Sequence, residues 1–184
     1  PVFHPKFSTI RQQRVVFLLF LFWNCNPMKK ILLFLFFIPL FSQAQIEKTI
    51  KLKLAVMQNF VSKGEEGLTM FWQTKGKITF GIVNYTEEQN PVFKELFVQQ
   101  YKELETIYMK MISSEDSKDT DLYVKTLIRQ EDDYRKLLST EQLKKYTYQL
   151  AEFEKSNPKA HDSYSSLFFS DNLLNEFKKA FQYK

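Results

Sequence analysis

Few residues of this chain have the type and spacing of a catalytic or metal-binding site. Residues 45–184 contain one histidine, His161, which stands in a polar segment. Metal binding and catalysis need several convergent groups, so we expect His161 to be an ordinary surface residue. The sequence has no His-Glu-x-x-His, no Gly-x-Ser-x-Gly and no glycine-rich phosphate loop. We therefore expect a protein that is not an enzyme and that uses no cofactor.

Two acidic stretches are the other candidates for chemistry. The first consists of Glu115, Asp116, Asp119 and Asp121. Its spacing does not match that of an EF-hand calcium loop, and it lacks the glycine that such a loop requires. The second, Glu131-Asp132-Asp133, is predicted to lie on a helix, where adjacent side chains point in different directions. We expect a solvated loop for the first stretch and a solvent-facing helix surface for the second.

The segment before residue 45 has the layout of a leader. Met28-Lys29-Lys30 is a short positive start, Ile31–Phe41 is an apolar run, and Ser42-Gln43-Ala44 supplies small residues for a cleavage site. The run is shorter than the roughly 20 residues that a membrane-spanning helix needs. We predict that residues 28–44 are a secretory signal peptide, and that the processed chain has no membrane segment.

Residues 1–27 contain a second apolar patch, Val15–Trp23, and no initiator methionine. We expect translation to start at Met28 and residues 1–27 to come from an over-extended gene call. Cys25, the one cysteine, also precedes Met28, so residues 45–184 have no disulfide, thiolate metal site or cysteine nucleophile. Because no cysteine follows the apolar run, the usual bacterial lipid-anchor signal is missing. We expect a periplasmic or secreted protein.

The positive charge of the chain belongs to the leader. Residues 1–44 hold five of the 26 basic residues and none of the 21 acidic ones, so residues 45–184 carry no net charge. Nucleic-acid binding needs a basic patch on the folded domain, and the basic pI of the whole chain is no evidence for one. We expect no nucleic-acid partner.

The clearest predicted helix spans residues 90–112. Asn90 can cap it, and Pro91 suits the first helical position, where its missing N–H costs no hydrogen bond. Apolar residues at helical spacing give this helix one continuous face, formed by Phe93, Leu96, Phe97, Tyr101, Leu104, Ile107, Tyr108 and Met111. The all-α prediction depends on this rod and on a second one, Tyr123–Phe153, that pairs with it along the apolar side.

Apolar stripes predict further helices at residues 46–62, 120–138, 140–155 and 171–183. The stripe of the first is Ile50, Leu54, Met57 and Val61, and Ser170 can cap the last. A polar loop is expected from Pro158 to Ser170. Residues 68–83 also allow a short β-hairpin that turns at Lys75-Gly76, but we favour a helix because everything downstream is helical. We predict one all-α domain, residues 45–184, of four or five amphipathic helices in a bundle or a thin cradle.

Two pentapeptides predict helix starts of one kind, Tyr85-Thr86-Glu87-Glu88-Gln89 and Leu138-Ser139-Thr140-Glu141-Gln142. In a capping box, a hydroxyl accepts a hydrogen bond from an N–H of the first turn. A Gln three residues later reaches back to the N–H of the cap residue. The predicted capping residues are Thr86, Gln89, Ser139, Thr140 and Gln142. Such a box is an element of the fold and does not itself indicate an activity.

Both pentapeptides resemble the Leu-Thr-x-x-Gln motif that occurs twice in the periplasmic Spy/CpxP-like proteins. Ser139 stands where the motif has Thr, and Tyr85 where it has Leu. The resemblance covers residues 85–155. It implies a thin all-α cradle that dimerises through its long helices. It also implies ATP-independent binding of unfolded or stress-damaged envelope proteins.

The resemblance further implies a concave face that mixes cationic and apolar side chains. The nearest candidates for its cations are Lys94, Lys102, Lys110, Lys144 and Lys145. Independently, Tyr164, Phe168 and Phe169 lie near a predicted loop and suit an exposed partner-binding patch. The lysines also fit a solvated face balanced by neighbouring acids, and the aromatic residues also fit packing under the last helix.

The leading hypothesis is an exported, non-enzymatic helical protein that binds other polypeptides, as a chaperone or a stress-response accessory. The alternative is a structural or sensor-interaction protein that binds one folded partner in the envelope. The first predicts general suppression of aggregation, and the second predicts a defined complex without it.

Overall fold

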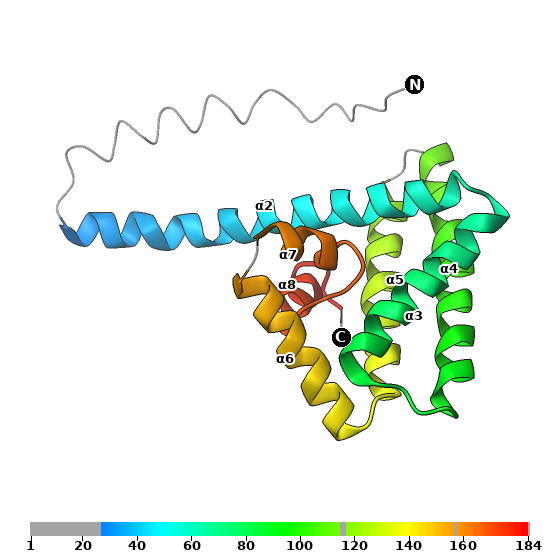
Figure 1. Cartoon of the computed structure of the whole chain (residues 1–184). Helices are drawn as coiled ribbons and strands as arrows, with labels where there is room; N and C mark the ends of the chain where they lie inside the picture. Colours follow the sequence, from blue (N-terminus) through cyan, green and yellow to red (C-terminus); the bar gives the residue numbers. More distant parts are fainter. Residues whose placement is uncertain (1–26, 115–116, 157, 184) are drawn as a thin grey trace. The chain divides into compact units, whose positions relative to one another are not determined.

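The computed structural model describes residues 27–114, 117–156 and 158–183 (Figure 1). Within these ranges the regular secondary structure is entirely helical, which confirms the all-α prediction. The chain divides into two compact units, residues 1–44 and 45–184. None of the described helices is both long and apolar enough to span a membrane.

Seven helices occupy the described residues, more than the four or five expected. They are α2 (Pro27–Val61), α3 (Glu65–Val83), α4 (Gln89–Ser114), α5 (Ser117–Lys136), α6 (Thr140–Ser156), α7 (Pro158–Ser165) and α8 (Asp171–Ala180). The segment 68–83 is helical, as favoured, and forms no hairpin. The loop predicted from Pro158 is wrong in part, because Pro158 ends one helix and begins another. Proline suits the first position of a helix, where no N–H is required.

In the second unit, α3 packs against α4, and α4 packs against α5 with the opposite chain direction (Figure 1). Helix α6 contacts α3, α7 contacts α6, and α8 contacts α5 and α6. Short connections place successive helices side by side, as in a bundle.

Ser170 caps α8 as predicted, since its hydroxyl accepts a hydrogen bond from the N–H of Leu173 at 3.2 Å.

A tight turn joins the end of α2 to α3. Gly64 has φ 59°, a left-handed conformation that favours glycine. Three residues later, Gly67 lies directly against the backbone of α2, where an added Cβ would come within 1.9 Å of the carbonyl oxygen of Phe60. The two helices therefore touch through their main chains.

The buried side chains form three neighbouring groups, centred on Phe97 and Tyr146, on Ile128 and Phe177, and on Met57 and Tyr101. The predicted face of residues 90–112 is buried or half-buried along its length. The predicted stripe of the first helix lies off centre. The buried residues there are Ile46, Thr49, Lys53, Met57 and Phe60. A lysine and a threonine therefore occupy the middle of the buried face.

Candidate functional site

The first capping box has the geometry of its motif. Gln89 donates its backbone N–H to the Thr86 hydroxyl at 3.3 Å, and the Thr86 N–H donates to Gln89 Oε1 at 3.0 Å. Asn90 is not the cap, because its own N–H donates to the Thr86 carbonyl at 3.2 Å. Pro91 is the third residue of α4 and the fifth after Thr86, so the capped segment accommodates a proline one turn beyond its cap. Helix α4 thus starts earlier than the Asn-Pro pair suggested.

The second capping box repeats the arrangement at the start of α6. Gln142 N–H donates to the Ser139 hydroxyl at 3.2 Å, and Ser139 N–H donates to Gln142 Oε1 at 3.0 Å. Ser139 is therefore the cap. Thr140 is the exposed first residue of the helix, so of the two candidate caps, Ser139 and Thr140, the structure selects Ser139.

The two boxes are joined to each other. The Nε2 of Gln89 donates to Oε1 of Gln142 at 3.1 Å, and the Nε2 of Gln142 donates back to Oε1 of Gln89 at 2.8 Å. Gln142 Nε2 also donates to the Asn84 carbonyl at 3.3 Å. Each side-chain carbonyl oxygen of the pair accepts two hydrogen bonds, one from the N–H of the cap residue of its own helix and one from the amide of the other glutamine. The junction therefore fixes the starts of α4 and α6 relative to each other.

A pair of phenol groups lies beside this junction. The hydroxyls of Tyr85 and Tyr134 are 3.0 Å apart, both residues are buried, and the Tyr85 ring stacks on Phe93 with centroids 4.1 Å apart. Burial raises the pKa of Tyr85 to about 12 and raises that of Tyr134 further. Both phenols stay protonated at neutral pH, and their role is structural.

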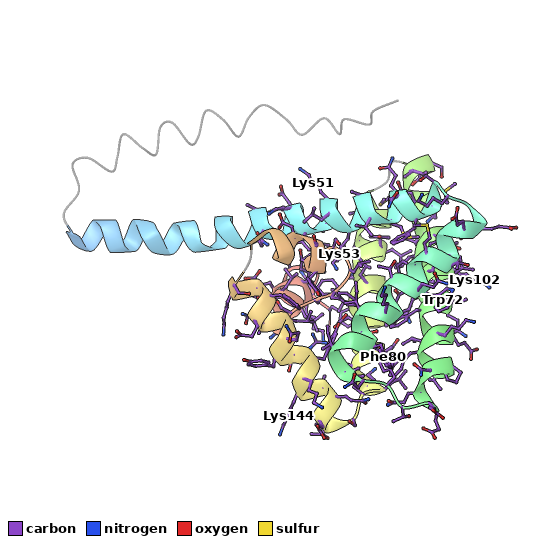
Figure 2. All side chains as sticks on the ribbon, in the orientation of Figure 1. Lys51, Lys53, Trp72, Phe80, Lys102 and Lys144 are labelled. Carbon is purple, nitrogen blue, oxygen red and sulfur yellow. The ribbon has the colours of Figure 1, made fainter. Side chains whose placement is uncertain are left out.

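A buried cluster of charged residues is the main feature that the sequence did not reveal. Lys53 of α2 is 2% exposed, and its Nζ donates to the Phe168 carbonyl at 3.1 Å and lies 3.8 Å from the centroid of the Phe169 ring. Figure 2 shows Lys53 and Lys51 on opposite sides of α2. Burial lowers the Lys53 pKa to about 7, against the raising effect of the Glu131 charge.

Lys75 of α3 is the second buried amine. Its Nζ donates to Gln100 Oε1 at 2.9 Å and faces the rings of Phe97 and Phe71. The Gln100 side chain in turn donates to the Gln130 carbonyl at 3.0 Å, so one chain of hydrogen bonds links α3, α4 and α5. Burial lowers the Lys75 pKa to about 8, and Glu131 again opposes the fall.

Glu131 is the carboxylate at the centre of this cluster. It is 4% exposed, which overturns its placement on a solvent-facing surface. Its Oε1 accepts hydrogen bonds from Arg135 Nε at 2.8 Å and from the Tyr146 hydroxyl at 3.0 Å. For Lys75, the sequence contains one signal of burial, its helical spacing: Lys75 lies four residues from both Phe71 and Thr79 on a buried stripe of α3. The cluster is a fully packed network, and its contacts assign it a role in holding the helices together.

The candidate binding surface is an open groove between α3 and the first turns of α4. It has a volume of about 510 Å³ and is lined by Trp72, Gln73, Gly76, Lys77, Phe80, Tyr85, Asn90, Pro91, Phe93, Lys94 and Phe97. Phe93 and Phe97 are buried beneath it, whereas Phe80 is 46% exposed. Lys94 Nζ is held 4.8 Å from the centroid of the Trp72 ring. We refer to this surface as the α3–α4 groove.

The structure separates the five lysines proposed for a common face. Lys94 lines the α3–α4 groove, and none of the other four does. Lys110 pairs with Asp119 at 2.7 Å, and Lys145 pairs with Glu141 at 2.9 Å. Lys102 and Lys144 are exposed. Four of the candidates therefore fit a solvated surface.

Of the two alternatives for the aromatic residues near the predicted loop, the structure selects packing into the core for Phe168 and Phe169 and excludes them from an exposed partner-binding patch. Phe168 and Phe169 are each 1% exposed, because they pack into the core between α6, α8 and the buried lysines. Tyr164 is half-buried and stacks on Phe153 with centroids 4.0 Å apart. These residues hold α7 and the segment after it on the domain.

The predicted acidic loop is described only in part. Glu115 and Asp116 lie outside the described residues. Asp119 is buried and accepts hydrogen bonds from Lys110 and Ser114. The described residues contain no group of three His, Cys, Asp or Glu side chains arranged to hold a metal ion.

The chain finds no match among protein-family models, among curated proteins or among solved structures. Its function is therefore inferred from its own residues.

Proposed function

We propose that this protein binds exposed segments of other polypeptides through the α3–α4 groove, without ATP, as a chaperone or a stress-response accessory of the cell envelope. The observation that carries the proposal is the groove itself. It is an apolar hollow with an aromatic floor and a partly exposed phenyl ring at Phe80. Binding of a partner over apolar surface of this kind is favourable, because it removes that surface from water.

Two features of the sequence support the rest of the proposal. The layout of residues 28–44 supports export to the periplasm or beyond. The two pentapeptides support a likeness to the Spy/CpxP-like proteins, and they form paired capping boxes at the starts of two long helices. A non-enzymatic role fits a buried charge cluster whose groups hydrogen-bond to one another and to the backbone.

Suppression of aggregation by the purified protein tests the proposal. An unfolding client protein should scatter less light when this protein is present in several-fold excess, with no nucleotide added. Phe80→Ser should reduce the effect, because it removes the exposed ring of the groove. The matched control is Tyr148→Ser, which removes an aromatic ring that is 66% exposed on α6, outside the groove.

No suppression at several-fold excess would contradict the proposal. A stable complex with one folded protein, combined with no general suppression, would instead support the sensor-interaction alternative. Size-exclusion chromatography of the protein with each client distinguishes these two results.

A further inference from the structure

The charged side chains that line the α3–α4 groove have one sign. Its two charged lining residues are Lys77 of α3 and Lys94 of α4, and no carboxylate lines it. Both lysines are exposed at the rim, while the floor is aromatic. This local asymmetry contrasts with residues 45–184 as a whole, which carry no net charge. A partner that fits the groove therefore needs a negative group at its edge.

The dimensions of the groove suit a short peptide segment. Trp72 and Phe80 both line it from α3 (Figure 2). They are eight residues apart, which corresponds to about 12 Å along a helix. An extended chain advances about 3.3 Å per residue, so this length accommodates roughly three or four residues. The volume of about 510 Å³ leaves space for one bulky side chain among the aromatic rings.

The position of Lys94 disfavours a cationic ligand. Its Nζ already occupies the face of Trp72, the best site in the groove for a cation–π contact. A second cation there would be repelled by Lys94 and by Lys77. A carboxylate beside Trp72 would instead be attracted to Lys94 Nζ. The aromatic floor next to it favours a flat apolar group on the same ligand.

We infer that the α3–α4 groove recognises a short extended segment of a partner polypeptide in which an aromatic side chain neighbours an acidic one. The aromatic side chain packs against the exposed ring of Phe80, above the buried Phe93, and the carboxylate pairs with Lys94 or Lys77. This inference rests on the proposed function, since it names the class of segment that the groove selects.

Fluorescence of Trp72 gives a direct test. The full chain has two tryptophans, so Trp23→Phe leaves Trp72 as the single reporter. The ligands are three blocked hexapeptides, which alternate Phe with Glu, Phe with Lys, or Ala with Glu. The Phe/Glu peptide should change the Trp72 emission in a saturable way. The Phe/Lys and Ala/Glu peptides should bind at least about ten-fold more weakly, because each lacks one half of the recognised pair.

Substitutions at the rim test the charge contribution. Lys94→Gln and Lys77→Gln should each weaken Phe/Glu binding by about five-fold and reduce its dependence on salt. Lys102→Gln, an exposed lysine of α4 outside the groove, is the matched control and should leave binding unchanged. All three positions are exposed, so the variants should fold normally, which circular dichroism checks.

Several results would overturn the inference. They are equal binding of the Phe/Glu and Phe/Lys peptides, an equal loss with Lys102→Gln and Lys94→Gln, or binding of free phenylacetate as tight as that of the peptide. If the protein suppresses aggregation but does not select the Phe/Glu peptide, the inference fails and the proposed function stands. If the peptide binds in the groove but no client is protected, the proposed function fails instead.

Discussion

The side-chain amides of Gln89 and Gln142 hydrogen-bond to each other in both directions, although the two residues are 53 positions apart in the chain. Each amide also closes the capping box of its own helix. A local signal for a helix start and a long-range contact between two helices therefore use the same atoms. The free energy of unfolding that is lost by a substitution in one box should therefore depend on whether the other box is intact.

Alanine substitutions test this coupling. Gln142→Ala should lower the free energy of unfolding by about 2 kcal/mol, because it leaves the Ser139 N–H and the Gln89 amide without their partner. Gln89→Ala should cost about 1 kcal/mol. The double variant should cost clearly less than the sum, with a coupling energy of about 0.5–2 kcal/mol in urea denaturation. Gln99→Ala, which removes an exposed amide bonded to Glu95, is the control and should change little. Additive effects at the two boxes would contradict the coupling.

The buried amine of Lys53 should make stability depend on pH. Its pKa is about 7 in the folded protein and about 10.5 when exposed, so the unfolded chain binds more protons between these values. Stability should therefore rise from pH 7 to pH 9, and the pKa of Lys75, about 8, contributes in the same direction. Lys53→Met removes this titrating amine and should flatten the rise.

Denaturation in urea at pH 7, 8 and 9 measures both effects. Lys51→Met, on the exposed side of the same helix, is the matched control and should keep the slope of the wild-type protein. A Lys53→Met protein with an unchanged pH dependence would show that this amine is not the titrating group.

Loss of the Glu131 charge should lower the free energy of unfolding. Glu131→Gln removes the carboxylate that accepts from Arg135 and Tyr146, and it removes the negative charge that raises the pKa of Lys53 and Lys75. We expect a loss of about 3–5 kcal/mol at pH 7, because removing one partner of a buried ion pair leaves the other uncompensated. Asp133→Asn, at an exposed pair with Arg129, should cost less than about 1 kcal/mol and serves as the comparison.

Two glycines of α3 should respond oppositely to alanine. At Gly67 the added methyl group would lie 1.9 Å from the Phe60 carbonyl oxygen, so α2 and α3 must separate at a cost of about 2 kcal/mol or more. At Gly81 nothing lies within 4 Å, and alanine should stabilise the helix by about 0.5–1 kcal/mol. Thermal unfolding of the two variants should shift the midpoint in opposite directions. A stabilised Gly67→Ala protein would contradict the close contact between the helices.

The sequence predicted the parts of this fold that depend on local chemistry. Apolar residues at helical spacing located the core faces of α4, α5, α6 and α8, and hydroxyl caps located the starts at Ser139 and Ser170. Asn90 and Pro91 suggested a start that was too late, because the Thr86 box competes with that pair and prevails. Pro158 was interpreted only as a stop, although proline also suits the first position of a helix, which is the place of Pro158 in α7.

The features that sequence reasoning missed depend on several elements at once. A lysine within an apolar stripe suggests a break in the buried face. The burial of Lys53 and Lys75 is evident only once the fold brings acceptors to them, the Phe168 carbonyl for Lys53 and the Gln100 side chain for Lys75. Glu131 was assigned to solvent because it stands in an acidic run, Glu131-Asp132-Asp133, on a predicted helix. The α3–α4 groove joins Trp72 and Phe80 of one helix to Phe93 and Lys94 of the next. No spacing along the chain indicates that they share a hollow.

The enclosure of Lys53 and Lys75 also makes them natural reporters of opening of the domain. An acylating reagent in neutral buffer should modify the surface amines first, because these two amino groups are packed against rings and carbonyls and out of its reach. Their acylation, followed peptide by peptide in a mass spectrometer, would then record how often the helices part under native conditions, without any denaturant.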